Sequence, residues 1–232
     1  DFGQTLTVDN EGSIYVGGWT NGTLPGQTSE GSADAFIRKY DSNGSEVWTW
    51  QFGTTAFDEV SGLLADDGDV LYASGVTAGA LGDHTNAGAQ DAYVVSFDKS
   101  GRQLGVVQYG SNGDDAAHAM ALDDEGNLYV SGWTNGALPG QSRNGVNDAY
   151  VLRMSSMLAT ALVTADVPGR IWTRQFGTQA NDFAGDAWVD SAGNVIVAGW
   201  SSDAFPNQRF EGGEYDGFLR KYAGDGSELW TR

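Results

Sequence analysis

The sequence predicts an all-β protein, a β-propeller of four blades that each contain four antiparallel strands. Two sequence markers support this prediction, and each occurs four times. An Asp-Ala-aromatic run starts at Asp34, Asp91 and Asp148, at a constant spacing of 57 residues, and returns in a Gly-containing form at Asp216. A Tyr-Val-x-Gly-Trp run and its variants start at residues 15, 72, 129 and 196. A repeating unit of this length that contains several turn sequences is typical of a propeller blade.

Each repeat contains four strand candidates. The first is rich in small residues in several copies, such as the alanines of 115–123, as expected for a strand crowded near an axis. A tight turn with Gly or Asn leads to the second, which is the Tyr-Val-x-Gly-Trp run. A longer loop leads to the third, at 34–40 in the first repeat, and another tight turn leads to the fourth, at 46–52. The predicted blades cover 1–53, 58–110, 115–177 and 182–232, within a single domain of residues 1–232.

The third repeat carries an insertion at 154–169, between its third and fourth strand candidates. The insertion contains the apolar run 157–163, which would favour aggregation if it were exposed. We therefore expect it to cover a neighbouring surface or a partner chain.

The composition excludes several classes of function. The chain has 12 basic and 31 acidic residues and a net charge of −19, which repels nucleic acid. It has no cysteine, and hence neither disulfides nor thiolate chemistry. It has no apolar run long enough to insert into a membrane. Two explanations of the acidity remain open, a solvated surface suited to salty or secreted conditions and the binding of divalent cations.

The repeated aspartates fall into two groups. Those that precede the tight turns, Asp9, Asp66, Asp123 and Asp190, are expected to cap backbone N–H groups. Those that begin the first strands are the candidate metal ligands Asp1, Asp58, Asp115 and Asp182. In a four-fold ring they would converge near the axial channel, where Ca²⁺ would relieve their repulsion. The alternative is that each caps a turn at the rim.

Residues that recur on or near the long loops are candidate ligand-binding residues. Trp19, Trp133 and Trp200 stand where the second strand enters the long loop, and either pack between blades or stack against sugars. The loops themselves carry Gln27, Gln141 and Gln208, with His84 as the substitute in the second repeat. These side chains either anchor the loops or bind a ligand, because variable loops on one face are a common binding surface.

Catalysis has little support in the sequence. Its two histidines, His84 and His118, do not occupy equivalent repeat positions, and no nucleophile, phosphate-binding or zinc motif is present. Near-identical blades argue against a single asymmetric active site, so we expect no enzyme. A glycosidase or lyase that uses a carboxylate pair is the minor alternative.

Several motifs resemble the SBBP-type β-propeller repeat. They are Asp-Ala-Phe-x-x-Lys-Tyr-Asp-x-x-Gly, the Trp-Thr-Arg-Gln-Phe-Gly-Thr run at 172–178, and the Thr-Asn-Gly-x-Leu-Pro-Gly-Gln loop at 20–27 and 134–141. The second repeat departs from the pattern, with Leu-Gly-Asp-His at 81–84 and Gly105 in place of Trp. The resemblance covers the whole chain. It implies a propeller from a secreted or surface protein of bacteria or archaea, without a common activity.

The chain opens on a first strand and closes on a fourth, so no strand remains to be exchanged across a ring closure. Three arrangements are open: a four-bladed ring that closes by packing alone, a segment of a longer array, and a larger ring made by two chains. We expect the closed ring, because an open array leaves the faces of the terminal blades uncovered.

The sequence thus favours a non-enzymatic extracellular β-propeller that serves as a structural or interaction module, with Ca²⁺ as a candidate stabilising ion. The alternative is a lectin-like propeller that binds carbohydrate on the long-loop face. The expected partners are a protein or a surface glycan, outside the cell or at its surface, without nucleic acid or membrane insertion. Self-assembly through the terminal blades or the insertion at 154–169 is a further expectation.

Overall fold

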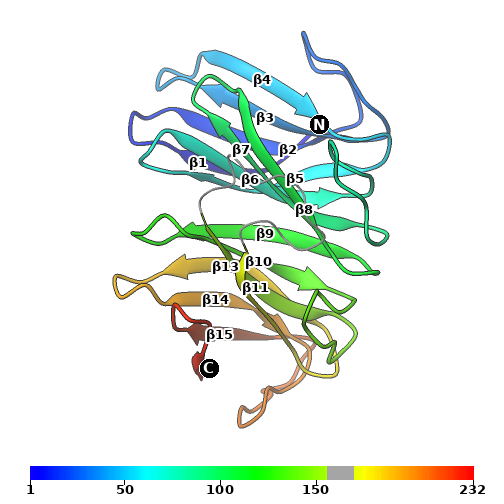
Figure 1. The fold of residues 1–232 in the computed structure, drawn as a ribbon, viewed down its shortest axis with the longest axis vertical. Coiled ribbons are helices and arrows are strands. Elements are labelled where there is room, and N and C mark those ends of the chain that lie inside the picture. The colour runs from blue at the N-terminus through cyan, green and yellow to red at the C-terminus, as the bar shows by residue number, and fades with distance from the viewer. Residues whose placement is uncertain (156–169) are drawn as a thin grey trace.

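The computed structural model describes residues 1–155 and 170–232 and confirms the all-β prediction (Figure 1). In this part of the chain, sixteen strands form four sheets, and each sheet contains four strands that pair in chain order. All pairings are antiparallel. Each sheet is one blade, and the blades follow one another from the N-terminus to the C-terminus.

The strand bounds follow the repeat. Blade 1 contains β1 (Phe2–Val8), β2 (Ile14–Thr20), β3 (Asp34–Tyr40) and β4 (Glu46–Phe52). Blade 2 contains β5 (Asp58–Ala65), β6 (Val70–Thr77), β7 (Asp91–Asp98) and β8 (Gln103–Tyr109). Blade 3 contains β9 (Asp115–Leu122), β10 (Leu128–Thr134), β11 (Asp148–Met154) and β12 (Arg170–Phe176). Blade 4 contains β13 (Asp182–Val189), β14 (Val195–Ser201), β15 (Asp216–Tyr222) and β16 (Glu228–Thr231).

The first strands lie innermost, as the small residues predicted. Successive first strands contact one another, β1 with β5, β5 with β9 and β9 with β13. The approach is close, because a Cβ on Gly62 would collide with the backbone oxygen of His118 in the next blade. Only residues with little or no side chain fit such a contact, which explains the Gly and Ala content of these strands.

The hydrophobic cores lie between blades. Ile37 of blade 1 and Tyr93 of blade 2, for example, belong to one buried cluster, and neither side chain is exposed to solvent. Two further clusters join blade 2 to blade 3 and blade 3 to blade 4. A single sheet cannot enclose a core, so each blade depends on its neighbour for burial.

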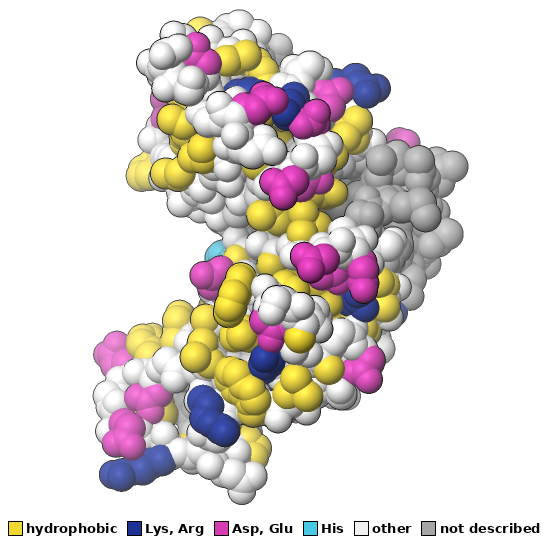
Figure 2. All heavy atoms as spheres, turned by 90° about the vertical axis from the view of Figure 1, so that its left-hand side faces the viewer, with side chains coloured by type: hydrophobic (Ala, Val, Ile, Leu, Met, Phe, Trp, Pro, Cys, Tyr) yellow, Lys and Arg dark blue, Asp and Glu magenta, His cyan; other side chains and the backbone are white. Residues whose placement is uncertain are grey.

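The four blades form an open arc, and the expected closed four-bladed ring is wrong. The N- and C-termini lie at opposite ends of the molecule, and the space-filling view shows a crescent (Figures 1 and 2). No extensive strand contact joins blade 4 to blade 1 among the described residues. The outer face of β1 is accordingly exposed at Phe2, Leu6 and Val8.

The predicted insertion begins at Met154, the last residue of β11. Residues 156–169 lie outside the described part of the chain, so the role expected of the insertion stays a prediction. None of the described residues forms a helix long and apolar enough to cross a membrane.

Candidate functional site on the turn face of the arc

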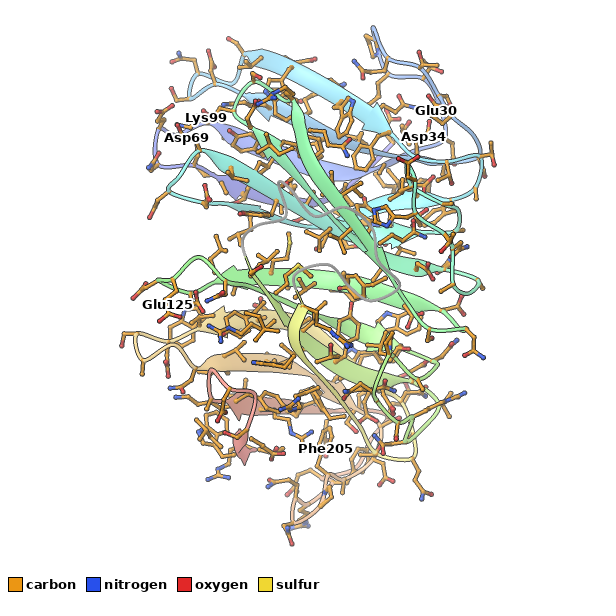
Figure 3. All side chains as sticks on the ribbon, viewed as in Figure 1. Glu30, Asp34, Asp69, Lys99, Glu125 and Phe205 are labelled. Atoms are coloured by element: carbon orange, nitrogen blue, oxygen red, sulfur yellow. The ribbon has the colours of Figure 1, made fainter. Side chains whose placement is uncertain are left out.

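The two ends of the blades differ in construction. We call the end with the tight hairpin turns the turn face and the end with the long loops the loop face. Figure 3 labels Asp69, Lys99 and Glu125 at the turn face, and Glu30 and Asp34 at the loop face. At the turn face, Lys99 forms ion pairs with Asp69 at 2.5 Å and with Glu11 at 2.9 Å. The pair with Glu11 joins turns of blades 1 and 2, whereas the pair with Asp69 joins two turns within blade 2.

A glutamine fastens each long loop of the first three blades, and it is buried in blades 1 and 2 and half-buried in blade 3. The Gln51 amide donates to Asp34 Oδ2 at 2.6 Å and to the Gly22 carbonyl at 2.8 Å, and its oxygen accepts from the Leu24 N–H at 2.8 Å. Gln108 and Gln175 make the same three kinds of bond in blades 2 and 3. The sequence analysis did not single out these glutamines, although Gln-Phe-Gly or Gln-Tyr-Gly occurs in each of the first three repeats.

The glutamines that the sequence suggested as ligand-binding residues also hold loops in place. The side-chain oxygens of Gln27 and Gln141 accept from the backbone N–H groups of Gln51 at 3.0 Å and Gln175 at 3.1 Å. Gln208 donates to the Thr231 carbonyl at 3.1 Å. His84 Nε2 lies 3.1 Å from the carbonyl oxygen of Val106 in blade 2. Each of these side chains therefore has an anchoring role, and ligand binding by them stays a prediction.

The repeated tryptophans pack against aromatic rings of the protein, either within one blade or between two blades. Trp19 stacks on Phe2 with ring centroids 4.4 Å apart, and Trp200 stacks on Phe183 at 4.1 Å. Trp133 contacts the same Phe183 from the preceding blade at 5.2 Å, and its indole N–H donates to His118 Nε2 at 3.1 Å. These rings therefore have partners within the protein.

The candidate metal ligands stand at separate junctions. Asp58, Asp115 and Asp182 are fully buried, whereas Asp1 is exposed and accepts from the Thr20 hydroxyl. The Asp115 N–H donates to the Gln90 carbonyl at 2.9 Å, and Asp58 and Asp182 make the same bond to the blade before them. The described residues contain no group of three or more His, Cys, Asp or Glu that could hold a metal. The expected convergence of the four carboxylates on the axis is thus not what the fold produces.

Each junction instead pairs two aspartates from neighbouring blades. At the second junction, Asp91 Oδ1 and Asp115 Oδ2 both lie within 2.8 Å of the point where a Cβ on Gly110 would stand. Burial raises the pKa of Asp115 above its usual value and the Asp91 charge adds to this, while hydrogen bonds from Ser111 and Thr134 act in the opposite direction. Burial raises the pKa of Asp58 and Asp182 as well, and the charges of Asp34 and Asp148, respectively, add to this.

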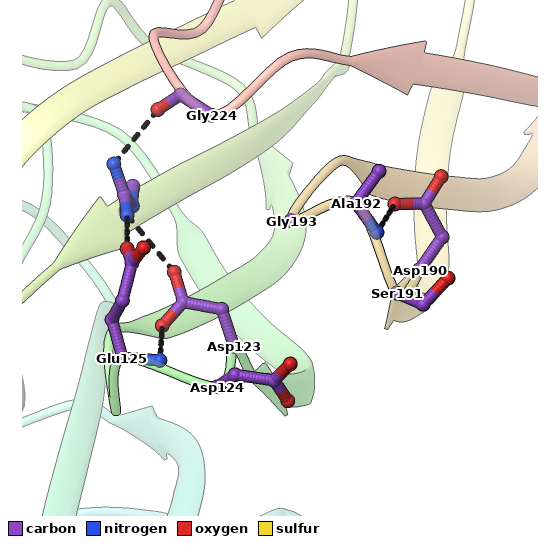
Figure 4. A pocket seen from close by; sticks show the side chains of 9 residues that line it. Asp123, Asp124, Glu125, Asp190, Ser191, Ala192, Gly193 and Gly224 are labelled. Carbon is purple, nitrogen blue, oxygen red and sulfur yellow. Dashed lines mark hydrogen bonds and ion pairs between the residues drawn. The ribbon is translucent and has the colours of Figure 1, made fainter.

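The turn aspartates cap backbone groups, as expected. Asp123 Oδ1 accepts from the Glu125 N–H at 3.1 Å and from the Asn127 N–H at 2.7 Å. Its Oδ2 forms an ion pair with Arg153 at 2.9 Å. Figure 4 shows the contacts of Asp123 with Glu125 and Arg153 on one wall of a hollow of about 360 Å³, with the Asp190 turn on the other wall. The hollow lies between the turns of blades 3 and 4.

A larger groove of about 690 Å³ adjoins this hollow and runs across three blades. Its apolar wall comes from the ends of β5, β9 and β13, with Leu64, Met120 and Trp188 among its residues. Its polar lining includes four aspartates, Asp66, Asp67, Asp123 and Asp124, and none of the described lining residues is Lys or Arg. The turn-face groove, as we call it, thus joins apolar surface to an acidic rim that has no Lys or Arg among its described lining residues.

The sequence analysis missed Trp188 as a surface residue. Its indole is 64% exposed and lines the blade 4 end of the groove. The signal was available, because Trp188 breaks the pattern of first strands: the equivalent residues in blades 1, 2 and 3 are Thr7, Leu64 and Ala121. Unlike Trp19, Trp133 and Trp200, Trp188 does not recur at an equivalent position of another repeat.

The comparisons with known proteins agree with this architecture. The model of the SBBP family, described as a beta-propeller repeat, matches residues 1–25 and 101–139. These two segments carry the SBBP beta-propeller repeat. They lie in blade 1 and in blades 2 and 3, and the same four-strand pattern occurs in all four blades.

A curated relative of this chain is the regulatory protein FlaEY of Caulobacter vibrioides. The two are 30% identical over 210 residues, which cover 82% of this chain and 21% of FlaEY. The chain therefore spans about a fifth of the length of that relative. Among solved structures, the Neurospora crassa Pan2 WD40 domain is similar to this chain. The alignment covers 99% of this chain and 65% of the Pan2 chain, with 11% identity and a TM-score of 0.45.

Proposed function

We propose that this chain is a non-enzymatic interaction module that binds a basic segment of a partner protein in the turn-face groove. The observation that carries the proposal is the combination of an apolar wall and an acidic rim without lining cations. Exposed aromatic residues in concave sites commonly anchor protein partners, and Trp188 is such a residue. Likeness to a protein named as regulatory supports an interaction role.

Charge complementarity selects the partner. A chain with a net charge of −19 attracts cations over a long range, and a concave site with carboxylates on its rim concentrates that field. Lys or Arg side chains of the partner would meet Asp67 and Asp124, which are exposed, while its apolar side chains would meet Trp188 and Leu64. Such charged contacts mainly increase the association rate, and their effect becomes smaller as the salt concentration rises.

The test uses a labelled peptide of mixed Arg and Leu residues as the probe, with a Glu and Leu peptide as the comparison. We expect the Arg peptide to bind the chain and to bind the Asp67→Asn, Asp124→Asn double variant about fivefold more weakly or worse. The matched control is the Glu30→Gln, Asp83→Asn double variant, which removes the same charge from exposed loop-face residues. Equal losses in both double variants would show that only net charge matters and would overturn the proposed site.

Calcium binding is a second part of the proposal. Each junction supplies two carboxylates, whereas Ca²⁺ takes six to eight oxygens, so backbone carbonyls and water would have to complete any site. Binding to the folded state would raise the melting temperature. An equal melting temperature in calcium and in excess chelator, with no metal in elemental analysis, contradicts it.

We also propose that the chain acts outside the cytoplasm, which its acidic composition and lack of cysteine support. Fractionation of the source cells tests this. The lectin-like alternative predicts signals on a glycan array that the Arg peptide does not compete away, and such a result would replace the protein partner with a carbohydrate.

A further inference from the structure

One face of blade 4 lacks the cover that the same face has in every other blade. Leu219 pairs with Ala198 across the sheet, as Ile37, Val94 and Val151 pair with the corresponding residues of blades 1, 2 and 3. Those three side chains are 0% exposed because the next blade covers them, whereas Leu219 is 45% exposed. The repeat therefore builds an apolar contact surface on blade 4 that has no neighbour within the described chain.

Blade 1 lacks cover on its opposite face, the one that packs against the preceding blade in blades 3 and 4. Leu6 occupies the first-strand position held by Met120 in blade 3 and Ala187 in blade 4. Met120 and Ala187 are 9% and 8% exposed because they pack against the preceding blade, whereas Leu6 is 66% exposed. The two ends of one molecule thus carry the two halves of the junction that occurs three times inside it.

We propose that a second copy of this chain docks head to tail, with its blade 1 face on the blade 4 face of the first copy. The contact is heterologous, since two different surfaces meet, and the internal junctions define its register. It leads to a closed ring or to a longer assembly, depending on the curvature of the arcs. This inference rests on the terminal faces and does not depend on the turn-face groove.

The internal junctions specify which atoms would meet. The Trp48 indole N–H donates to the Lys99 carbonyl at 3.1 Å, and the Trp172 indole N–H donates to the Gly224 carbonyl at 2.9 Å. Both acceptors lie one residue into the last hairpin turn of the next blade. The equivalent pair across the new junction is the Trp230 indole N–H and the carbonyl of Ser42 in the second copy.

An aromatic contact repeats in the same way. Trp133 of blade 3 contacts Phe183 of blade 4 with ring centroids 5.2 Å apart. Trp200 is the equivalent of Trp133, and Phe2 is the equivalent of Phe183. Trp200 of one copy, which is half-buried, would therefore contact Phe2 of the other, which is 57% exposed.

Sedimentation of the purified chain over a range of concentrations tests the proposal. We expect assemblies larger than the monomer, and we expect salt to strengthen them because each copy carries −19. Leu6→Arg and Leu219→Arg should each weaken association at least tenfold. Ile171→Arg is the matched control, since Ile171 is similarly exposed at 48% but lies in β12, away from both terminal faces.

Mixing the two variants identifies the geometry. A Leu6→Arg copy keeps an intact blade 4 face and a Leu219→Arg copy keeps an intact blade 1 face, so the mixture should form a dimer that neither variant forms alone. Circular dichroism confirms that each variant is folded. A monomer at all concentrations, an equal effect of Ile171→Arg, or no dimer in the mixture overturns the proposal.

Discussion

Asp91 and Asp115 approach the same backbone carbon, that of Gly110, from two successive blades. Both side chains are fully buried, and Asp91 Oδ1 has no hydrogen-bond partner in the described structure. A buried pair of carboxylates without a cation is unfavourable at neutral pH. The junctions therefore hold stored electrostatic strain.

Asp91→Asn should stabilise the protein at pH 7. Its Oδ2 accepts from the Ala87 N–H at 2.8 Å and from Gln108 at 2.9 Å, and an asparagine oxygen can keep both bonds. The asparagine nitrogen then replaces the unpartnered Oδ1 and can donate toward Asp115. A gain of about 1 kcal/mol would raise the melting temperature by roughly 2–4 °C for a chain of this size.

The repeat provides an informative control for this variant. Both oxygens of Asp148 accept N–H groups, Oδ1 from Gly145 at 2.9 Å and Oδ2 from Asn144 at 2.7 Å. Asp148→Asn must therefore place an amide nitrogen against a donor, and we expect it to lower the melting temperature. Equal shifts in the two variants would contradict the proposed difference between the junctions.

The stability should fall as the pH rises from about 4, because the junction carboxyls have raised pKa values. Burial and the neighbouring carboxylate raise the pKa of Asp58, Asp115 and Asp182 above the usual 3.8. Above pH 3.8 the folded state then holds more protons than the unfolded state, so the free energy of unfolding decreases until the folded pKa is passed. Urea unfolding at a series of pH values measures this, and Asp91→Asn should reduce the slope.

Asp123 should show the opposite pH dependence. Burial raises its pKa, but the bonds from Asn127 and Arg153 outweigh this and hold the pKa below its usual value. The contribution of Asp123 to the free energy of unfolding is therefore present above pH 3.8. It is lost as the pH falls through the lower pKa that Asp123 has in the folded state. Asp123→Ala should cost about 1–3 kcal/mol at pH 7, since it leaves two turn N–H groups without an acceptor and removes the closest ion-pair partner of Arg153. A loss that persists unchanged at pH 3 would contradict this account.

Gln108→Ala should release the long loop of blade 2. Gln108 is 8% exposed and supplies three hydrogen bonds, to Asp91, to the Gly79 carbonyl and from the Leu81 N–H. Buried groups left without partners cost about 1–3 kcal/mol each, so we expect a loss of several kcal/mol. Hydrogen exchange should show faster exchange at Leu81 but little change in the hairpin turn at 98–102.

Gly110→Ala should destabilise the junction between blades 2 and 3. The new methyl group would lie within 2.8 Å of oxygens from both Asp91 and Asp115, which are held by hydrogen bonds and cannot move freely. Gly185→Ala is the control, because a Cβ there meets nothing within 4 Å. Thermal melting should show a loss of about 1–3 kcal/mol at Gly110 and a small change at Gly185.

The sequence alone determined the blade. Strands such as Asp34–Tyr40 and Glu46–Phe52 follow directly from turn residues and from alternation, which are local properties, and the 57-residue spacing makes the four copies equivalent. The capping role of Asp123 was likewise predictable, because the acceptor and its N–H donors lie within four residues of each other.

Only the tertiary structure decided how the blades meet. The pairing of Asp91 with Asp115 and the burial of Gln108 depend on atoms brought together from distant segments, so they leave no local signal. The curvature of the arc depends on how side chains such as Tyr93 and Phe52 pack between sheets, with ring centroids 6.0 Å apart. The same packing left Leu6 and Leu219 exposed at the two ends and Trp188 at the groove, because burial in a propeller comes from the neighbouring blade.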